Sequence, residues 1–273
     1  MTVEQTPSPT ADTIVLIHGL WMTPSVWTQW IEHYRRPGYE VLAPGYPGLD
    51  SDAQALRDDP SPIEGLTVEE TAAHYEAVIR SLTTPPIIVG HCFGGALVQL
   101  MLDRGLGAAG VAIHSVPVRG VEFPSLAEIG EHLPPMGPPA RRAAAVTLSL
   151  EQFEYSFTNV CTQAETLDAY ERLAIPAPVR LLWDGVLDSA GSNGATTVDF
   201  ARSDRAPLLF VAGGADNLIP ASVNWTNYQR YASASDAPVA FREFSGRCHF
   251  TLGQTGWQDV ADYALRWVMH PQG

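Results

Sequence analysis

The sequence contains no lysine, and all 16 of its basic residues are arginines. Without lysine the chain cannot form the Schiff base of a pyridoxal-phosphate enzyme or an aldolase, and it has no P-loop or kinase lysine. Its 30 acidic residues give a formal net charge of −14, and no run of basic residues is present. Nucleic acid and anionic membrane surfaces are therefore not expected as partners.

Long apolar runs and paired cysteines are missing as well. No stretch approaches ~18 consecutive apolar residues, so we expect no transmembrane helix. The first residues lack the basic and apolar regions of a signal peptide. The three cysteines, Cys92, Cys161 and Cys248, have no paired spacing. These features predict a cytoplasmic protein without a disulfide framework.

Short apolar runs alternate with helical patterns along much of the chain. Hydrophobic residues make up 45% of the 273 residues and charged residues 17%, which is enough for one sizeable core. The runs typical of buried parallel strands are Thr13–Ile17, Tyr39–Ala43, Pro86–Val89, Gly110–His114, Pro207–Ala212 and Val239–Phe244. Helical patterns cover Pro24–Arg36, Thr67–Leu82, Phe93–Asp103, Ala221–Tyr231 and Trp257–Val268. The alternation predicts an α/β fold, with one mainly parallel sheet of about six strands flanked by helices on both faces.

One long stretch, from Gly120 to Asp199, does not follow this alternation. It consists of helical pieces separated by prolines, without a convincing core strand: Pro124–His132, Pro139–Leu148, Leu150–Thr158, Gln163–Leu173 and Val179–Asp188. An insertion between two parallel strands often covers the strand ends. We therefore expect a core formed by residues 1–119 and 200–273 and an all-helical lid at 120–199. A second independent domain is the alternative.

A dinucleotide-binding motif and a zinc site are both disfavoured by the spacing of the residues concerned. Gly105–Gly110 spells G-x-G-x-x-G, but it follows a helix and precedes a strand, whereas a dinucleotide fingerprint requires the opposite order. The cysteines together with His249 lack a recognisable zinc-ligand spacing. We therefore expect neither a cofactor nor a metal.

The most informative motif is Gly90-His91-Cys92-Phe93-Gly94, between a predicted strand and a predicted helix. This is the context of a nucleophile elbow, in which glycines two residues before and after the nucleophile make room for a sharp turn. The turn lifts Cys92 clear of the sheet, where we expect an exposed thiol at a helix N-terminus that favours an anion. The alternative is a buried structural cysteine in an incidental turn.

Together with three further segments, this motif resembles the α/β-hydrolase superfamily over nearly the whole chain. The four segments are His18-Gly19-Leu20-Trp21, the elbow, Gly213–Pro220 with Asp216, and Gly246–Phe250 with His249. They follow the chain order of this fold, in which the nucleophile precedes the acid and the histidine. The resemblance implies a catalytic triad of Cys92, His249 and Asp216. It also implies an oxyanion hole made by the backbone N–H groups of Leu20 and Phe93.

The sequence departs from the family pattern at its nucleophile and at its start. Cys92 replaces the usual serine, as in members that resemble dienelactone hydrolases or the cysteine-dependent cyclases that release tetramates. About twelve residues precede the first strand, so the leading antiparallel hairpin of the family is expected to be missing. Many thioesterase-type members carry the acid after the strand that follows the nucleophile helix. That place here reads His114-Ser115-Val116-Pro117, so Asp216 keeps the role.

The expected chemistry is acyl transfer through a thioester on Cys92, with His249 as base and Asp216 orienting it. His18 and His91 are expected to be structural. Apolar and aromatic residues are frequent in the expected lid, including Phe153, Tyr155, Phe157 and Trp183. With Trp21 from the oxyanion turn, Tyr155 and Trp183 are the candidate substrate-binding residues, although any of these rings could instead pack the lid onto the core.

Three functions stay open on the sequence alone. The first is a hydrolase of esters or thioesters, acting on a small-molecule or carrier-bound acyl substrate of apolar character. The second is a cyclase or acyltransferase of natural-product biosynthesis, which releases the acyl group to an internal carbon, amine or alcohol. The third is a non-catalytic binding protein on the same fold, which an intact triad disfavours. A homodimer is also left open.

Overall fold

The computed structural model describes residues 11–49, 53–123, 130–134, 144–184 and 194–271. Its main sheet has six parallel strands in the order β2-β1-β3-β4-β7-β8. The strands are β1 (Thr13–Ile17), β2 (Glu40–Leu42), β3 (Ile87–His91), β4 (Ala109–Ile113), β7 (Leu208–Gly213) and β8 (Val239–Phe244). Every predicted core strand is therefore present, to within two residues at each end. The central strands β1, β3, β4 and β7 are buried along their whole length, because helices cover both faces of the sheet.

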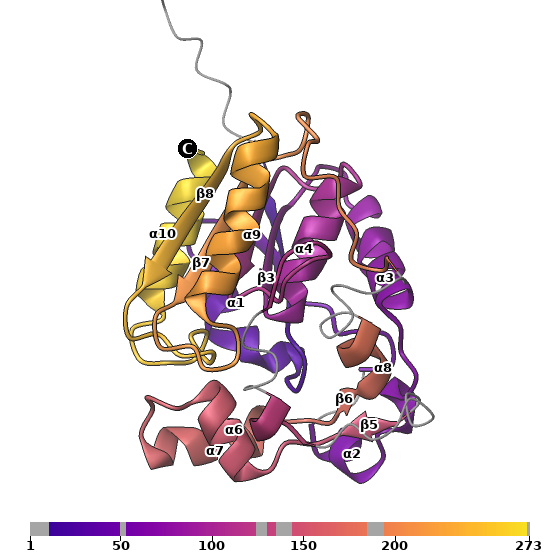
Figure 1. Ribbon diagram of the computed structural model, residues 1–273, viewed down its shortest axis with the longest axis vertical. Coiled ribbons are helices and arrows are strands. Elements are labelled where there is room, and N and C mark those ends of the chain that lie inside the picture. Colours follow the sequence, from indigo (N-terminus) through magenta and orange to yellow (C-terminus); the bar gives the residue numbers. More distant parts are fainter. Residues whose placement is uncertain (1–10, 50–52, 124–129, 135–143, 185–193, 272–273) are drawn as a thin grey trace, which may run out of the picture.

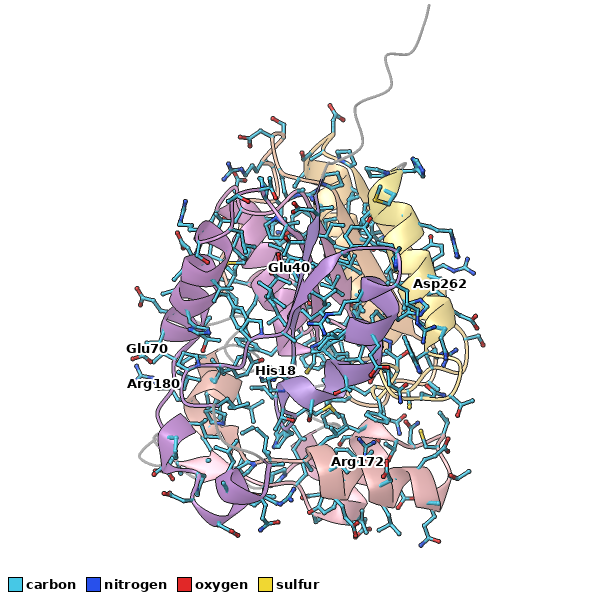
Figure 2. The ribbon with its side chains drawn as sticks, turned by 180° about the vertical axis from the view of Figure 1, so that it is seen from behind. His18, Glu40, Glu70, Arg172, Arg180 and Asp262 are labelled. Carbon is cyan, nitrogen blue, oxygen red and sulfur yellow. The ribbon has the colours of Figure 1, made fainter. Side chains whose placement is uncertain are left out.

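Helices cover both faces of this sheet, as predicted. α4 (Phe93–Asp103) and α9 (Ala221–Ala234) lie in front of the strands in Figure 1, together with α3 (Val68–Arg80). α1 (Thr28–Arg35) and α10 (Gln258–Met269) lie on the opposite face, which Figure 2 shows from behind with Asp262 labelled on α10. In the described parts of the chain, no helix has both the length and the apolar character needed to cross a membrane.

Local details of the helices follow the sequence closely. The capping box of α3 is present: the Glu70 backbone N–H donates to Thr67 Oγ1 at 3.1 Å, and the Thr67 N–H donates to Glu70 Oε2 at 3.0 Å. The helix expected from Pro24 begins instead as a 3₁₀ turn, η1 (Pro24–Trp27), before α1. Two short elements had no clear pattern and were not predicted: α2 (Ala53–Asp58) and η2 (Ser61–Ile63).

The segment between β4 and β7 is not all-helical, so this part of the prediction was wrong. It contains the expected α6 (Leu150–Phe157) and α7 (Gln163–Leu173), and α8 (Val179–Leu182). It also contains a small antiparallel sheet of β5 (Ala145–Val146) and β6 (Ala177–Pro178), where a helix had been expected over Pro139–Leu148. The pairing joins residues about thirty positions apart, which a local pattern does not reveal. The other expected pieces, Pro124–His132 and Val179–Asp188, lie partly outside the described residues.

This inserted segment lies at the carboxyl ends of the parallel strands, below the sheet in Figure 1. Main-chain hydrogen bonds tie it to the loops that follow two of the strands. The Ile175 N–H donates to the carbonyl of Trp21, after β1, at 3.0 Å. The Phe250 N–H, after β8, donates to the carbonyl of Phe157 at 2.8 Å. The insertion therefore contacts the loops expected to carry the oxyanion turn and the histidine.

Candidate active site

The turn after β3 has the geometry of a nucleophile elbow. Cys92 has φ 56° and ψ −120°, a strained conformation for a residue with a side chain, and it immediately precedes α4. A Cβ on Gly90 would clash with the carbonyl of Gly94, and a Cβ on Gly94 would clash with the carbonyl of Ile17. The expectation that both glycine positions must be very small is confirmed.

The thiol of Cys92 is buried, with 2% exposure, and the expectation of an exposed elbow was wrong. The turn after β1 closes over it: a Cβ added to Gly19 would lie 2.6 Å from Cys92 Cβ and 3.3 Å from its Sγ. Lifting a side chain clear of the sheet therefore does not expose it, because the β1 loop occupies the adjacent space. Of the three cysteines, only Cys161 is partly exposed.

Asp216 and His249 meet at the carboxyl ends of β7 and β8. The His249 Nδ1–H donates to Asp216 Oδ2 at 2.8 Å, and both side chains are fully buried. The other oxygen of Asp216, Oδ1, accepts the backbone N–H groups of Leu218 at 2.9 Å and Ile219 at 2.8 Å. Burial raises the pKa of Asp216, but His249 and the other hydrogen-bond donors outweigh it and hold that pKa below its usual value.

A residue that sequence reasoning did not assign also contacts the acid. The His114 Nδ1–H donates to the same Oδ2 atom of Asp216 at 2.7 Å, and its side chain is fully buried. His114 directly follows β4 and has a left-handed φ of 46°. Its position at a strand end was a usable signal, since other members of the fold place their acid there. The sequence could not show that the ring turns toward Asp216.

His91, His114 and His249 form a cluster of buried rings. The His91 Nε2–H donates to the carbonyl of His249 at 2.8 Å, and the centroids of these two rings are 4.7 Å apart. Burial lowers the pKa of His91 and of His114, in the latter case against the attraction of Asp216. Burial opposes charge on His249 too, but its interactions with Asp216 and Cys92 raise the pKa of His249 to about 10. The positive charge of the cluster therefore resides on His249.

The same cluster is the group of described residues best arranged for a metal ion. Each of the three histidines offers one nitrogen within 4.8 Å of the others. However, His114 and His249 both use Nδ1 on Asp216, and a cation would compete with the proton carried by His249. The Nε2 atom of His249 is buried, and Cys92 is among the groups that raise the pKa of this ring. This arrangement suits acid–base work better than metal coordination.

The two residues expected to form the oxyanion hole lie on either side of the thiol. Phe93 is the first residue of α4, and its backbone N–H has no intrahelical acceptor because no helical carbonyl precedes it. Leu20 follows Gly19 in the turn that packs against Cys92. His18, in the same turn, is structural in its contacts: its ring stacks on Tyr46 at 4.0 Å, and burial lowers its pKa to about 4.

The expected substrate-binding residues lie in different places. Trp21 is buried, donates from Nε1 to the carbonyl of Val146 at 3.1 Å, and packs edge-on to Phe157 at 6.3 Å between ring centroids. Phe157 in turn packs edge-on to the ring of His249 at 4.9 Å. Phe157 is thus the aromatic ring of the insertion that contacts the candidate triad. Trp183 is half-buried just after α8, which Figure 1 shows well apart from α6 and α7.

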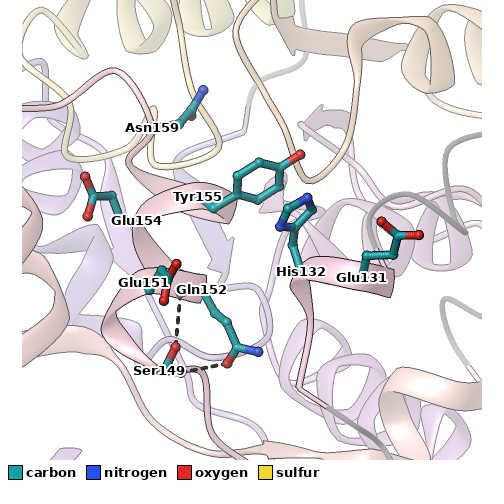
Figure 3. Close-up of a pocket in the computed structure, with 8 residues that line it drawn as sticks. All are labelled: Glu131, His132, Ser149, Glu151, Gln152, Glu154, Tyr155 and Asn159. Atoms are coloured by element: carbon teal, nitrogen blue, oxygen red, sulfur yellow. Dashed lines mark hydrogen bonds between the residues drawn. The ribbon is translucent and has the colours of Figure 1, made fainter.

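Tyr155 lines a separate hollow, shown in Figure 3. Its ring is 36% exposed and stacks on His132 with 3.6 Å between centroids. The hollow has a volume of about 670 Å³, and its walls also include Glu131, Ser149, Glu151, Gln152, Glu154 and Asn159. It borders the acid loop, because Asn159 Nδ2 donates to the carbonyl of Ala215 at 3.0 Å. None of the three candidate triad residues lines it.

A cysteine on a strand–turn–helix elbow, followed in the chain by an aspartate and a histidine at neighbouring strand ends, is the arrangement of the α/β-hydrolase class. The comparison of sequences agrees. The chain belongs to the alpha/beta hydrolase family, whose model matches residues 14–263. No curated protein matches the chain by sequence.

Several solved structures share this fold at low sequence identity. An extracellular alpha/beta-hydrolase from a Paenibacillus species is 20% identical, with a TM-score of 0.65, covering 93% of this chain and 98% of that one. The monoacylglycerol lipase of Paleococcus ferrophilus is 16% identical, with a TM-score of 0.67 and full coverage (100%) of both chains. A pyrethroid hydrolase of Sphingobium faniae is 16% identical, with a TM-score of 0.63, covering 96% of this chain and 99% of that one.

Proposed function

We propose that the protein hydrolyses an ester or thioester through a covalent thioester on Cys92, with His249 and Asp216 completing the triad. The observation that carries the proposal is the arrangement of His249. Its Nδ1–H is fixed on Asp216 at 2.8 Å, while its Nε2 is buried and Cys92 is among the groups that raise its pKa. This leaves one oriented nitrogen for proton transfer, as a general base beside a nucleophile requires.

The first half of the reaction forms the acyl-enzyme. His249 takes the thiol proton of Cys92, the sulfur attacks the carbonyl carbon of the substrate, and the carbonyl oxygen becomes an oxyanion. The backbone N–H groups of Leu20 and Phe93 stabilise it, which in comparable sites contributes roughly 3–4 kcal/mol per donor. The intermediate then collapses, the bond to the leaving group breaks, and the imidazolium of His249 gives its proton to the departing alcohol or thiol.

The second half releases the acyl group. His249, now neutral, takes a proton from water as the water oxygen attacks the thioester carbonyl. The second tetrahedral intermediate expels the Cys92 sulfur and yields the free acid. Asp216 holds the tautomer of His249 throughout and stabilises its charged form. No metal or cofactor takes part in these steps.

Residues 120–199 act in this proposal as a lid that covers the reaction. The contact of Phe157 with His249 supports it, because it places an apolar ring of the insertion against the imidazole. Such an apolar contact fits a small-molecule or carrier-bound acyl group of apolar character. Trp21 and Phe157 are the rings best placed to contact that group; Tyr155 and Trp183 are weaker candidates.

A second candidate is a cyclase or acyltransferase that gives the acyl group to an acceptor other than water. The burial of the thiol favours it, because a covered thioester is protected from hydrolysis and is readily attacked by amines and carbanions. Comparing the enzyme with Cys92→Ser tests this candidate. A higher ratio of transfer to hydrolysis for the thiol enzyme supports transfer, and equal ratios favour plain hydrolysis.

Intact-protein mass spectrometry with a panel of activated acyl esters and thioesters tests the proposed function. An acyl adduct should form on the peptide that contains Cys92 and should decay as the free acid appears. The double variant Cys161→Ser, Cys248→Ser is the matched control and should form the same adduct. Turnover without any adduct, or an adduct that persists in Cys92→Ala, would refute the covalent mechanism.

A further inference from the structure

Two cysteines that the proposed mechanism does not use are in contact. The Sγ atoms of Cys161 and Cys248 are 3.8 Å apart, although the residues are 87 positions apart in the chain. Cys161 lies in the turn between α6 and α7, and Cys248 immediately precedes His249. Two sulfurs at this separation are in van der Waals contact and need to approach by a further ~1.8 Å to form a disulfide.

The surroundings hold both thiols in this orientation. The Cys161 N–H donates to the carbonyl of Thr158 at 2.8 Å, which fixes the turn after α6. Gln254 Oε1 accepts the Cys248 backbone N–H at 3.1 Å and its thiol at 3.4 Å. The two segments are already joined next to the cysteines, through the main-chain hydrogen bond between Phe250 and Phe157. The pair is therefore built into the fold and does not depend on a chance approach of flexible loops.

The two thiols differ in access and in acidity. Cys161 is half-buried and reachable from solvent, whereas Cys248 is fully buried. The hydrogen bond with Cys248 lowers the pKa of the Cys161 thiol, while that same bond and burial raise the pKa of Cys248. Thiolate character and exposure decide which thiol is oxidised first. Cys161 thus has the properties of an attacking cysteine, and Cys248 those of a resolving cysteine.

We propose that Cys161 and Cys248 form a peroxide-sensitive site that closes to a disulfide beside the catalytic histidine. The Cys161 thiolate attacks one oxygen of hydrogen peroxide, the O–O bond breaks, and Cys161 sulfenic acid and hydroxide form. The Cys248 sulfur then attacks the Cys161 sulfur and loses its proton, and the sulfenic oxygen leaves as water. In the balance, two thiols give up two electrons and two protons, and one peroxide becomes two waters.

The disulfide acts on the active site through the loop that carries His249. Closing the sulfur–sulfur distance pulls Cys248 toward the α6–α7 turn and shifts its neighbour His249 relative to Asp216. It also fastens the insertion to the histidine loop at the point where Phe157 contacts His249. Misplacement of a catalytic group by about 1 Å can reduce a rate ~100-fold. We therefore expect oxidation to reduce turnover at least tenfold and reversibly; this effect, unlike the bond itself, rests on the proposed function.

Peptide mapping of the full chain after treatment with hydrogen peroxide tests for the bond. Because the chain has no lysine, trypsin cuts only at arginine and places the three cysteines in separate peptides, 81–104, 143–172 and 248–266. The expected product is a cross-link between 143–172 and 248–266, lighter by about 2 Da than the sum of the two thiol peptides and cleaved by dithiothreitol. Free thiols or sulfinic acids at both positions, or a cross-link to 81–104, would overturn the proposal.

The effect on turnover is measured in the Cys92→Ser background, where peroxide cannot attack the nucleophile. There, ester hydrolysis should fall at least tenfold on oxidation and return with dithiothreitol. The same background carrying Cys161→Ser should keep its activity in peroxide. If the cross-link forms and hydrolysis is unchanged, the control of activity is refuted. If Cys92→Ser hydrolyses nothing, the parent and Cys161→Ser are compared after limiting peroxide, and equal loss of turnover in the two refutes the control of activity.

Discussion

Replacing Asp216 by asparagine removes the carboxylate charge from the histidine cluster while keeping the size of the side chain. Both carboxylate oxygens are in use. Oδ1 accepts the N–H groups of Leu218 and Ile219, and Oδ2 accepts those of His114 and His249. In either orientation of the new amide, its NH₂ group must face two donors. Asp216→Asn therefore disturbs both the charge and the hydrogen bonding of the site.

The expected magnitude follows from these contacts. Two unit charges about 4 Å apart attract by ~4 kcal/mol at an effective dielectric constant of about 20. Losing that attraction from the charged form of His249 corresponds to a roughly 10³-fold lower kcat/KM, at 1.36 kcal/mol per decade. The two donors left unsatisfied each cost about 1–3 kcal/mol of folding free energy. The variant should therefore be nearly inactive and less stable.

The measurement is kcat/KM for an activated ester, together with the urea midpoint of each protein. Asp168→Asn serves as the control, because Asp168 makes an exposed ion pair with Arg172 at 2.6 Å in α7, and such pairs contribute at most ~1 kcal/mol. It should match the parent in both assays. A folded Asp216→Asn enzyme with kcat/KM within tenfold of the parent would show that Asp216 is not the acid.

Three further outcomes are expected. Because the folded pKa of His249, about 10, exceeds its ordinary value of 6.5, the stabilisation by its charged form is complete below pH 6.5 and is lost as the pH rises through about 10. Urea midpoints from pH 6 to 10.5 should fall accordingly, and less steeply in Cys92→Ser, because Cys92 is one of the groups that raise the pKa of His249; equal slopes would contradict this coupling. His114→Ala should lower kcat/KM about 10- to 100-fold, since a hydrogen bond to a charged group contributes ~1.5–3 kcal/mol. Loss of this donor should also raise the pKa of Asp216 and move the acid limb of the pH–rate profile to higher pH. His114→Asn, which tolerates the left-handed backbone and can still donate, should recover part of the loss, whereas no recovery would point to a packing role. Phe157→Ala should cost ~3–5 kcal/mol of folding free energy and alter kcat, while the half-exposed Tyr155→Ala should change neither much; the reverse ranking in urea melts and rate assays would place the functional ring at Tyr155.

Features that depend on local steric limits and on the periodicity of apolar residues could be predicted from the sequence. The strands follow from short apolar runs, and the elbow follows from glycines at the two positions where a Cβ would clash. The helical repeat also distinguishes the buried rings of α6 from the exposed one. Phe153 and Phe157 lie four residues apart on one face of α6 and are both buried, whereas Tyr155 lies on the opposite face and is partly exposed. Phe157 was therefore recognisable as the inward-facing ring.

Features that depend on distant contacts were not accessible in this way. The pairing of β5 with β6, the burial of Cys92 beneath the turn of Gly19, and the bond from His114 to Asp216 each join segments far apart in the chain. The three cysteines have no regular spacing, so nothing in the sequence pairs Cys161 with Cys248. Their contact arises because the α6–α7 turn docks on the histidine loop.

Two of the bonds that attach the insertion to the rest of the enzyme belong to the peptide backbone. The bonds from Ile175 to Trp21 and from Phe250 to Phe157 use only main-chain N–H and C=O groups, which every residue except proline at the donor position supplies. Side chains of the insertion can therefore be exchanged without removing these attachment points. A lineage of such enzymes, or a directed-evolution experiment, can therefore explore new acyl groups by substitution in the insertion while these two attachment points are kept. The requirement is that neither Ile175 nor Phe250 becomes proline.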